Sequence, residues 1–250
     1  MMKWRTFTVV SILAVALLLF AKHRSVVPER LAVNSVLDLT HTTLQISPKD
    51  SPNPLSASVK KDRISPELLG THIDAPASYE RTLWTVDQIP AERLVRPLAV
   101  IDVSRKSAKN PDYLLTVDDI AAWEDVHGHI PPGAVVLLRT GWGDRWNNPK
   151  AFRNADEHGA AHYPGYSIEA AQFLVDARYI VGIGTDAMTV DTGRSKDLPV
   201  HLYCSSRSVY HLENVANLEI TPESGATLVV APAKYEHGSG APTRLLAMLK

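Results

Sequence analysis

The sequence has very little cysteine and almost no net charge. Cys204 is the only cysteine in 250 residues, so no intrachain disulfide can form. The formal net charge is -1, and the chain after residue 25 carries 22 basic and 27 acidic residues. Nucleic-acid-binding surfaces are basic, so this balance argues against one. The hydrophobic content of 45% instead predicts a globular domain with a substantial core.

Several familiar catalytic motifs are also absent. There is no G-x-x-x-x-G-K-[S/T] phosphate loop and no G-x-S-x-G nucleophile turn. Cys204 lies three residues after His201, but no local motif supports a thiol nucleophile. We interpret Cys204 as a small buried apolar residue.

One long apolar run is present, at the N-terminus. Lys3 and Arg5 precede a mostly apolar run of 15 residues, 7–21, which is shorter than the ~20 residues that span a bilayer. This pattern predicts a secretory signal over residues 1–25. Because no A-x-A cleavage pattern follows, an uncleaved N-terminal anchor is the alternative, and it is the only membrane contact we expect. We therefore predict an exported protein, periplasmic or extracellular, with a linker at 26–35 and one domain at 36–250.

The remaining chain alternates between strand and helix patterns. Apolar runs predict strands at 36–39, 98–103, 134–139, 179–183 and 226–231. Helices are predicted at 117–127, where Thr116 begins a capping box and Gly128 ends the helix, and at 167–177. Residues 45–64 are rich in proline and serine and predict a loop. This alternation predicts an α/β fold.

A histidine and an aspartate stand two residues apart between two chain-punctuating residues. If the segment is extended, His72 and Asp74 leave the same face of the strand. Gly70 and Pro76 bound the pair tightly. An imidazole and a carboxylate that converge are the outline of a first-row metal site. The alternative is a histidine near a turn that is hydrogen-bonded to a neighbouring aspartate.

The surrounding segment resembles a known signature. Residues 68–78 are similar to H-x-G-T-H-x-D-x-P-x-H of the metal-dependent cyclase family, which includes bacterial kynurenine formamidases and isatin hydrolases. Further ordered matches extend the resemblance over most of the chain, at 38–41, 85–90, 139–142, 162–165, 182–186, 195–201, 212–214 and 238–240. The resemblance implies a swivelling β/β/α domain that assembles into dimers or tetramers.

The resemblance also implies a set of metal ligands, with two departures. His72 and Asp74 match two metal positions of the signature, and His201 and Glu213 match the downstream histidine and carboxylate. The signature's first histidine is replaced by Leu68. Two imidazoles and two carboxylates suit Zn²⁺ or Mn²⁺. Because an apolar side chain replaces one ligand, we expect one tightly held metal in preference to two.

The second departure is Ser78, which stands where the family has its proton-transfer histidine. A serine hydroxyl is a poor acid and base near neutral pH, but it can orient a water or bind a substrate oxygen. Glu213 is the first candidate to carry the proton instead. Glu80, His41, His162 and His211 are further candidates that the sequence does not place.

These features predict a metal-dependent hydrolase of a small amide. Arylformamidase activity, from N-formylkynurenine to kynurenine in tryptophan catabolism, is the most specific prediction, and ring opening of an isatin-type cyclic amide is the near alternative. Glu213 and Ser78 are the predicted catalytic residues, and Trp84 and His162 are predicted to border the substrate. A rival hypothesis is a pseudoenzyme that keeps the fold as a metal- or ligand-binding module, because Leu68 and Ser78 replace two histidines.

Overall fold

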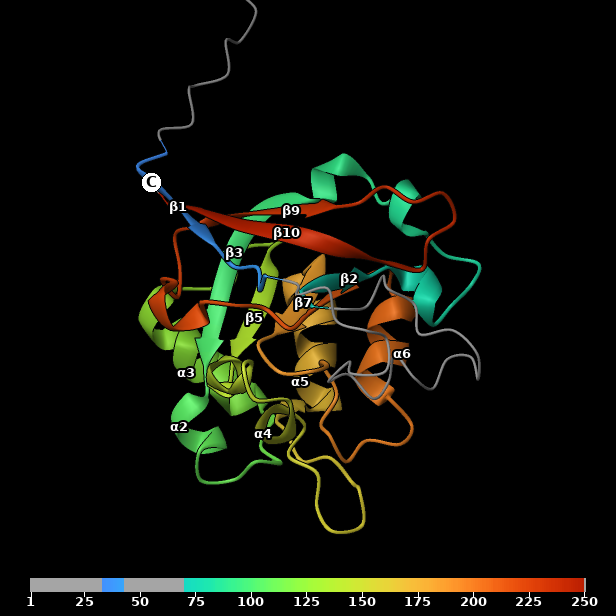
Figure 1. Ribbon diagram of the computed structural model, residues 1–250. Helices are drawn as coiled ribbons and strands as arrows, with labels where there is room; N and C mark the ends of the chain where they lie inside the picture. The colour runs from blue at the N-terminus through green and yellow to red at the C-terminus, as the bar shows by residue number, and fades with distance from the viewer. Residues whose placement is uncertain (1–32, 43–69, 250) are drawn as a thin grey trace, which may run out of the picture. The chain divides into compact units, whose positions relative to one another are not determined.

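The computed structural model describes residues 33–42 and 70–249 (Figure 1). Its strands are β1 (Ser35–Asp38), β2 (His72–Asp74), β3 (Val95–Asp102), β4 (Leu114–Leu115), β5 (Val135–Arg139), β6 (Gly165–Tyr166), β7 (Gly182–Thr185), β8 (Tyr210–Glu213), β9 (Thr227–Pro232) and β10 (Gly240–Leu249). Its α-helices are α2 (Ser104–Ser107), α3 (Val117–His127), α4 (Pro149–Arg153), α5 (Ile168–Gln172) and α6 (Pro199–Ser206). Short 3₁₀ turns lie at Pro76–Ser78, Val86–Gln88, Ala91–Arg93, Trp142–Arg145 and Leu218–Ile220.

The main sheet closes on itself. Its strand order is β1-β10-β2-β8-β7-β5-β3-β9, and β10 also pairs with β9. The first residues of β10 pair with β2, and the rest of the strand pairs with β9 and β1. Neighbours among β3, β5, β7 and β8 are parallel, and the other pairs are antiparallel. The result is a barrel-like sheet of seven strands in which β1 is an extra strand on β10.

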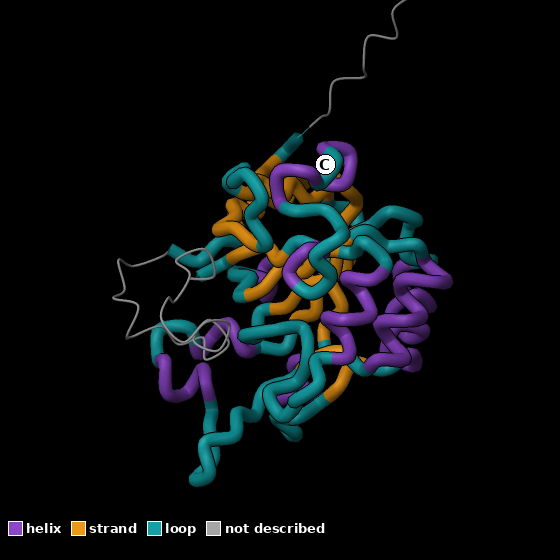
Figure 2. Tube along the Cα trace, turned by 90° about the vertical axis from the view of Figure 1, so that its right-hand side faces the viewer, coloured by secondary structure: helices purple, strands orange, loops and turns teal. Residues whose placement is uncertain are grey.

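Two cores lie on the two faces of this sheet. Ile73, Leu98 and Leu212 belong to one buried cluster, formed by residues from all around the sheet. Ile101 and Ile183 belong to the other, which packs against α3, α5 and α6. Figure 1 shows α5 and α6 side by side on the outer face, and Figure 2 shows a group of helical segments along one flank of the strands. Since side chains alternate along a strand, the residues on either side of Ile73 and Leu212 face α6.

Most of the predicted elements are present, and the predicted fold class is confirmed. Helix α3 begins as expected, because the Asp119 backbone N–H donates to Thr116 Oγ1 at 3.2 Å and the Asp119 carboxylate accepts the Thr116 N–H. Gly128 ends α3 with a φ of 80°. The strands predicted at 36–39, 98–103, 134–139 and 226–231 correspond to β1, β3, β5 and β9.

Two predicted elements have different bounds. The strand predicted at 179–183 is β7, which begins only at Gly182 because Tyr179 is left-handed with a φ of 54°. The predicted helix at 167–177 is α5, capped by Ser167, and it continues as a π-helical turn over Phe173–Ala177.

The N-terminal signal or anchor at 1–25, most of the linker and the loop at 45–64 lie outside the described residues. Within residues 33–42 and 70–249, none of the helices is long and apolar enough to cross a membrane.

Candidate metal centre

Two neighbouring strands carry matching pairs of potential ligands. Strand β2 contributes His72 and Asp74, and the antiparallel strand β8 contributes His211 and Glu213. The register places His72 opposite Glu213 and Asp74 opposite His211. Because directly paired residues share a face, the four side chains form a two-by-two array on the outer face of the sheet. All four are at least 94% buried.

Helix α6 adds a third imidazole to this array. His201 is completely buried, its Nε2 lies 3.0 Å from Glu213 Oε1, and its ring centroid is 4.8 Å from that of His211. Asp191, from the loop that follows β7, fixes the start of this helix. Its carboxylate accepts the backbone N–H groups of Val200 and His201 at 3.2 and 3.1 Å. We call His72, Asp74, His201, His211 and Glu213 the donor cluster.

The histidine rings are oriented by acceptors behind them. His72 Nδ1 donates to the Gly70 carbonyl at 2.9 Å, and His201 Nδ1 donates to Asp191 Oδ2 at 2.5 Å. Each ring therefore turns Nε2 toward Glu213, with His72 Nε2 3.3 Å from Oε2. Such hydrogen bonds from the far nitrogen are typical of metal-binding histidines, because they fix the ring and its tautomer.

The polar atoms of the cluster fit a divalent cation. Two imidazole lone pairs that face a carboxylate repel it unless positive charge lies between them. No described residue donates a hydrogen bond to the buried Asp74 carboxylate. The potential ligand atoms of His72, Asp74 and Glu213 lie within 4.8 Å of one another, and so do those of Asp74, His201 and His211. Nitrogen and carboxylate oxygen donors of this kind suit Zn²⁺ or Mn²⁺.

The carboxylates of the cluster also stabilise positive charge within it, as the pKa values of its histidines indicate. Burial lowers the pKa of both imidazoles, but the carboxylates outweigh it. Hydrogen bonding to Glu213, with the charge of Asp74, raises the pKa of His72 to about 9. Asp191 and Glu213 raise the pKa of His201 to about 10. Burial and the charge of Glu213 raise the pKa of Asp74 to about 6.

An aromatic residue covers the cluster from one side. The Tyr79 ring lies 4.6 Å from the ring of His201 and 6.0 Å from that of His211. Burial, and then the charges of Asp74 and Glu213, hold the pKa of Tyr79 far above its ordinary value. The phenol therefore keeps its proton and stays a hydrogen-bond donor beside the cluster.

The other predicted site residues lie in different surroundings. Ser78 Oγ donates to the Ser239 carbonyl at 2.5 Å, so its proton is engaged by the backbone. Trp84 is partly buried against the hydrophobic cluster that contains Ile73 and Leu212, and the Arg93 guanidinium lies 5.2 Å from its ring. His162 binds two carboxylates, with Nδ1 2.9 Å from Asp112 and Nε2 3.4 Å from Asp156. The catalytic role of Ser78 and the substrate-binding roles of Trp84 and His162 stay predictions, and Leu68 lies outside the described residues.

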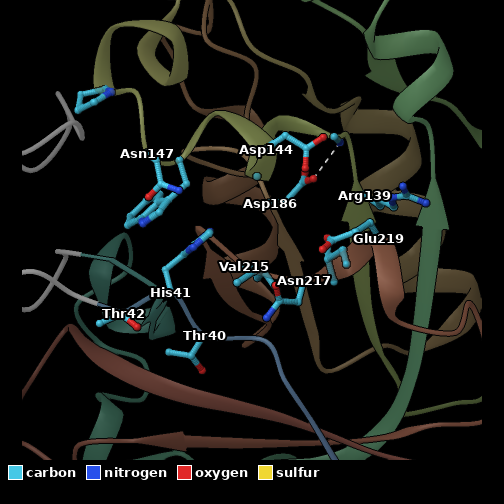
Figure 3. Close-up of a pocket in the computed structure, with 16 residues that line it drawn as sticks. Thr40, His41, Thr42, Arg139, Asp144, Asn147, Asp186, Val215, Asn217 and Glu219 are labelled. Carbon is cyan, nitrogen blue, oxygen red and sulfur yellow. Dashed lines mark hydrogen bonds between the residues drawn. The ribbon is translucent and has the colours of Figure 1, made fainter.

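A cavity of about 570 Å³ lies at the ends of β5, β7 and β8 (Figure 3). His41 and Asn147 stand at one end of it, and Arg139 and Glu219 stand at the other. The ring of His41 stacks on Trp146 at 4.1 Å. None of the cluster residues lines this cavity, but the His41 N–H donates to Thr71 Oγ1, next to His72 in the chain. The cavity and the cluster are thus neighbouring but distinct features.

Three residues in or beside the cluster were not assigned a place from the sequence. The sequence left His211 among several unplaced histidines, although H-x-E at 211–213 repeats the spacing of H-x-D at 72–74 and could have indicated a second strand. Asp191 and Tyr79 carried no comparable signal. Their roles depend on the loop and the turn that bring them to His201.

Comparisons with known proteins found similar sequences and similar structures. Residues 37–192 match the family model described as "Putative cyclase". The chain is 39% identical over 191 residues to an isatin hydrolase of Roseibium aggregatum, covering 73% of this chain and 72% of that protein. It is 27% identical over 180 residues to a kynurenine formamidase of Salinibacter ruber, covering 70% and 73%. A solved structure of an isatin hydrolase bound to the product analogue thioisatinate superposes with a TM-score of 0.74 at 30% identity, covering 99% of both chains.

Proposed function

This chain belongs to the cyclase family, and from that premise we propose that it is a metal-dependent hydrolase that opens a small cyclic amide of the isatin type. The observation that carries the proposal is the donor cluster, in which two oriented imidazoles and two carboxylates converge in a buried space. The sequence identity of 39% to an isatin hydrolase, over 73% of this chain, supports an isatin-type substrate.

His72, Asp74, His201 and Glu213 would hold the cation. When bound, a divalent cation lowers the pKa of a water and polarises a carbonyl. The protein fixes the geometry around it. Gly70 and Asp191 hold the two rings, and the Tyr79 ring packs against one side of His201. Such preorganisation is what a hydrolytic centre requires, because the donors do not need to move during the reaction.

The reaction breaks the amide carbon–nitrogen bond of the ring. The oxygen of water bonds to the carbonyl carbon, and one proton reaches the ring nitrogen as the bond breaks. We assign that proton to Glu213 because its carboxylate lies at the centre of the cluster, with Oε1 3.0 Å from His201 Nε2 and Oε2 3.3 Å from His72 Nε2. We therefore assign Glu213 a dual role, as a metal ligand and as a proton carrier.

The neighbouring cavity supports a substrate of this size. A volume of about 570 Å³ is ample for a flat bicyclic molecule, and the stacked rings of His41 and Trp146 offer an aromatic wall.

A second candidate reaction is hydrolysis of an N-formyl amide. The kynurenine formamidase of Salinibacter ruber supports it, at lower identity than the isatin hydrolase. The same cluster chemistry serves both reactions, since each replaces an amide nitrogen with a water oxygen. The two differ in the shape of the substrate that must reach the cluster.

The rival to both is a binding module without turnover. Ser78 motivates it, because its hydroxyl proton is taken by the Ser239 carbonyl and no imidazole stands at this position. General acid–base catalysis typically contributes 10²–10⁴-fold, so its loss slows hydrolysis without removing the metal's contribution. We therefore favour a slow hydrolase over an inactive module.

The test compares the two substrates on one preparation. The purified domain is loaded with Zn²⁺ or Mn²⁺, and the kcat/KM for isatin is measured beside that for N-formylkynurenine. We expect a higher value for isatin, and a loss of both activities in Glu213→Gln. Glu157→Gln is the matched control, because Glu157 is 86% exposed and lies outside both the cluster and the cavity, and it should keep its activity. Bound metal with no turnover of either substrate would support the binding module instead.

A further inference from the structure

Arg145 carries a positive charge that no described residue balances. Its guanidinium lies 3.6 Å from the ring centroid of Trp142, at the other end of the 3₁₀ turn Trp142–Arg145. Burial lowers the pKa of this guanidinium, and no hydrogen bond or neighbouring charge from the described residues offsets that effect. The indole covers one face of the guanidinium but accepts none of the N–H groups at its edge. Charged groups that leave water are normally paired, so this one requires an explanation.

A second unpaired donor borders the same space. Ser107, the last residue of α2, is 2% exposed, and its Oγ has no hydrogen-bond partner among the described residues. Ser107 and Arg145 both line a cavity of about 230 Å³ between α2 and the 3₁₀ turn. Buried hydroxyl groups are almost always paired, because an unpaired one loses its water without replacement. Two donors without acceptors at one cavity indicate a ligand that supplies acceptors.

The cavity has a second guanidinium, from Arg139 at the end of β5. Arg139 Nη1 donates to Asp102 Oδ2 at 2.8 Å, and this is the one hydrogen bond that the guanidinium makes to the described residues. Asp102 Oδ1 accepts the backbone N–H of Ser104 at 2.8 Å, which ties the pair to the start of α2. Because a guanidinium has five N–H donors, Arg139 is held in place and keeps donors for a ligand.

The charges at the cavity favour an anion. Two guanidinium groups line it, from Arg139 and Arg145, but only one carboxylate, that of Asp144. Asp144 is exposed and forms no ion pair with a described arginine. Arg105 on α2 and Lys109 just after it add exposed positive charge to the same segment. The cavity is therefore lined by more positive than negative charge.

We propose that this cavity binds a small oxyanion, a phosphate or a carboxylate group, through Arg139, Arg145 and Ser107. Guanidinium groups match such anions, because two of their N–H donors pair with two oxygens at once. Arg139 also lines the larger cavity of about 570 Å³, so the oxyanion can belong to a molecule held there or come from solution. None of the donor-cluster residues lines the small cavity, and anion binding there depends neither on a metal nor on turnover.

Titration calorimetry of the whole chain with inorganic phosphate, at fixed ionic strength, tests this site. The wild type should bind one phosphate per chain. Arg145→Gln should bind phosphate at least about tenfold more weakly, because a charge-assisted hydrogen bond is lost. Arg105→Gln is the matched control, since Arg105 is an exposed arginine on α2 that does not line the cavity, and it should bind phosphate as the wild type does.

Ser107→Ala separates a ligand from a structural hydroxyl, and it serves alone if Arg145→Gln does not fold. It should weaken phosphate binding by about threefold or more. Without phosphate it should melt at or above the wild-type temperature, because it removes an unpaired buried hydroxyl. A purely structural serine would give the opposite pair of results, a lower melting temperature with unchanged phosphate binding.

A second titration identifies the source of the oxyanion. Isatinate, the carboxylate that ring opening of isatin produces, is titrated with and without saturating phosphate. Isatinate binding that is weakened both by phosphate and by Arg145→Gln would assign the site to carboxylates as well. Isatinate binding that neither change affects would restrict the site to phosphate from solution.

Three results would overturn the proposal. One is a wild-type chain that binds no phosphate at millimolar concentration. Another is phosphate binding of equal strength in the wild type and in folded Arg145→Gln or Ser107→Ala. The last is an equal loss in Arg145→Gln and Arg105→Gln, which would show diffuse attraction to a basic surface in place of a defined site.

Discussion

Asp191 orients His201 without belonging to the donor cluster, and Asp191→Asn tests whether this orientation supports the proposed metal binding. Its Oδ2 accepts both the His201 Nδ1–H and the His201 backbone N–H, while Oδ1 accepts the Val200 N–H. The three N–H groups share both carboxylate oxygens of Asp191, whereas an asparagine side chain offers only one oxygen as acceptor. If the amide nitrogen faces Nδ1, the imidazole must shift its proton to Nε2, and the lone pair that faces the cluster is lost.

The size of the effect follows from the geometry. Residues that hold a metal-binding histidine in place typically contribute 10- to 100-fold to metal affinity. The hydrogen bond from His201 Nδ1 is short, at 2.5 Å, and its acceptor is charged and only 2% exposed, so we expect the upper part of that range. A loss of roughly 30- to 100-fold in affinity corresponds to about 2.0–2.7 kcal/mol of binding free energy.

Calorimetric titration of the metal-free protein with Zn²⁺ measures this loss. Asp125→Asn is the control, because Asp125 is an exposed aspartate on α3. The control should match the wild type. An Asp191→Asn protein that is folded and binds Zn²⁺ within about twofold of the wild type would refute the reasoning, since Asp191 would then not orient His201.

Three further predictions concern the stability of the fold and the missing histidine. Glu124 binds Arg178 through both oxygens at 2.6 and 2.7 Å, and this bond, opposed by burial, lowers its pKa from 4.5 to about 2. The ion pair stabilises the folded state fully above pH 4.5, the ordinary pKa of glutamate, and this stabilisation is lost as the pH falls toward 2. In denaturant titrations, Glu124→Gln should therefore lower the free energy of unfolding by about 2 kcal/mol at pH 7 and by almost nothing near pH 2. Gly184→Ala should destabilise the protein by about 1–3 kcal/mol in the same assay, because a Cβ there would lie 2.6 Å from the Leu212 carbonyl oxygen; unchanged stability would mean that β7 and β8 are not so closely packed. Ser78→His should raise kcat for isatin at least about tenfold by supplying an acid–base group, and a rate equal to the wild type would show that this position does not face the reacting atoms.

The local elements could be predicted because their signals are local. The Thr116 capping box and the left-handed Gly128 are set by a few adjacent residues, and they bound α3 as expected. The alternation of side chains along a strand also placed His72 and Asp74 on one face, although β2 has only three residues.

The rest of the cluster depends on long-range pairing, which sequence periodicity does not encode. His72 lies opposite Glu213, 141 positions away along the chain. The resemblance to a family identified Glu213 and His201 as ligands, because the family signature preserves their spacing. It did not identify His211, since that imidazole becomes meaningful only when the register places it opposite Asp74.

The most direct test of the account is a crystal structure of the protein grown with Mn²⁺, with anomalous scattering data collected above the manganese edge. The account predicts an anomalous peak roughly 2.0–2.3 Å from His72 Nε2, with Asp74 and Glu213 oxygens among its ligands. The absence of any peak at these residues, or peaks confined to other parts of the molecule, would contradict it.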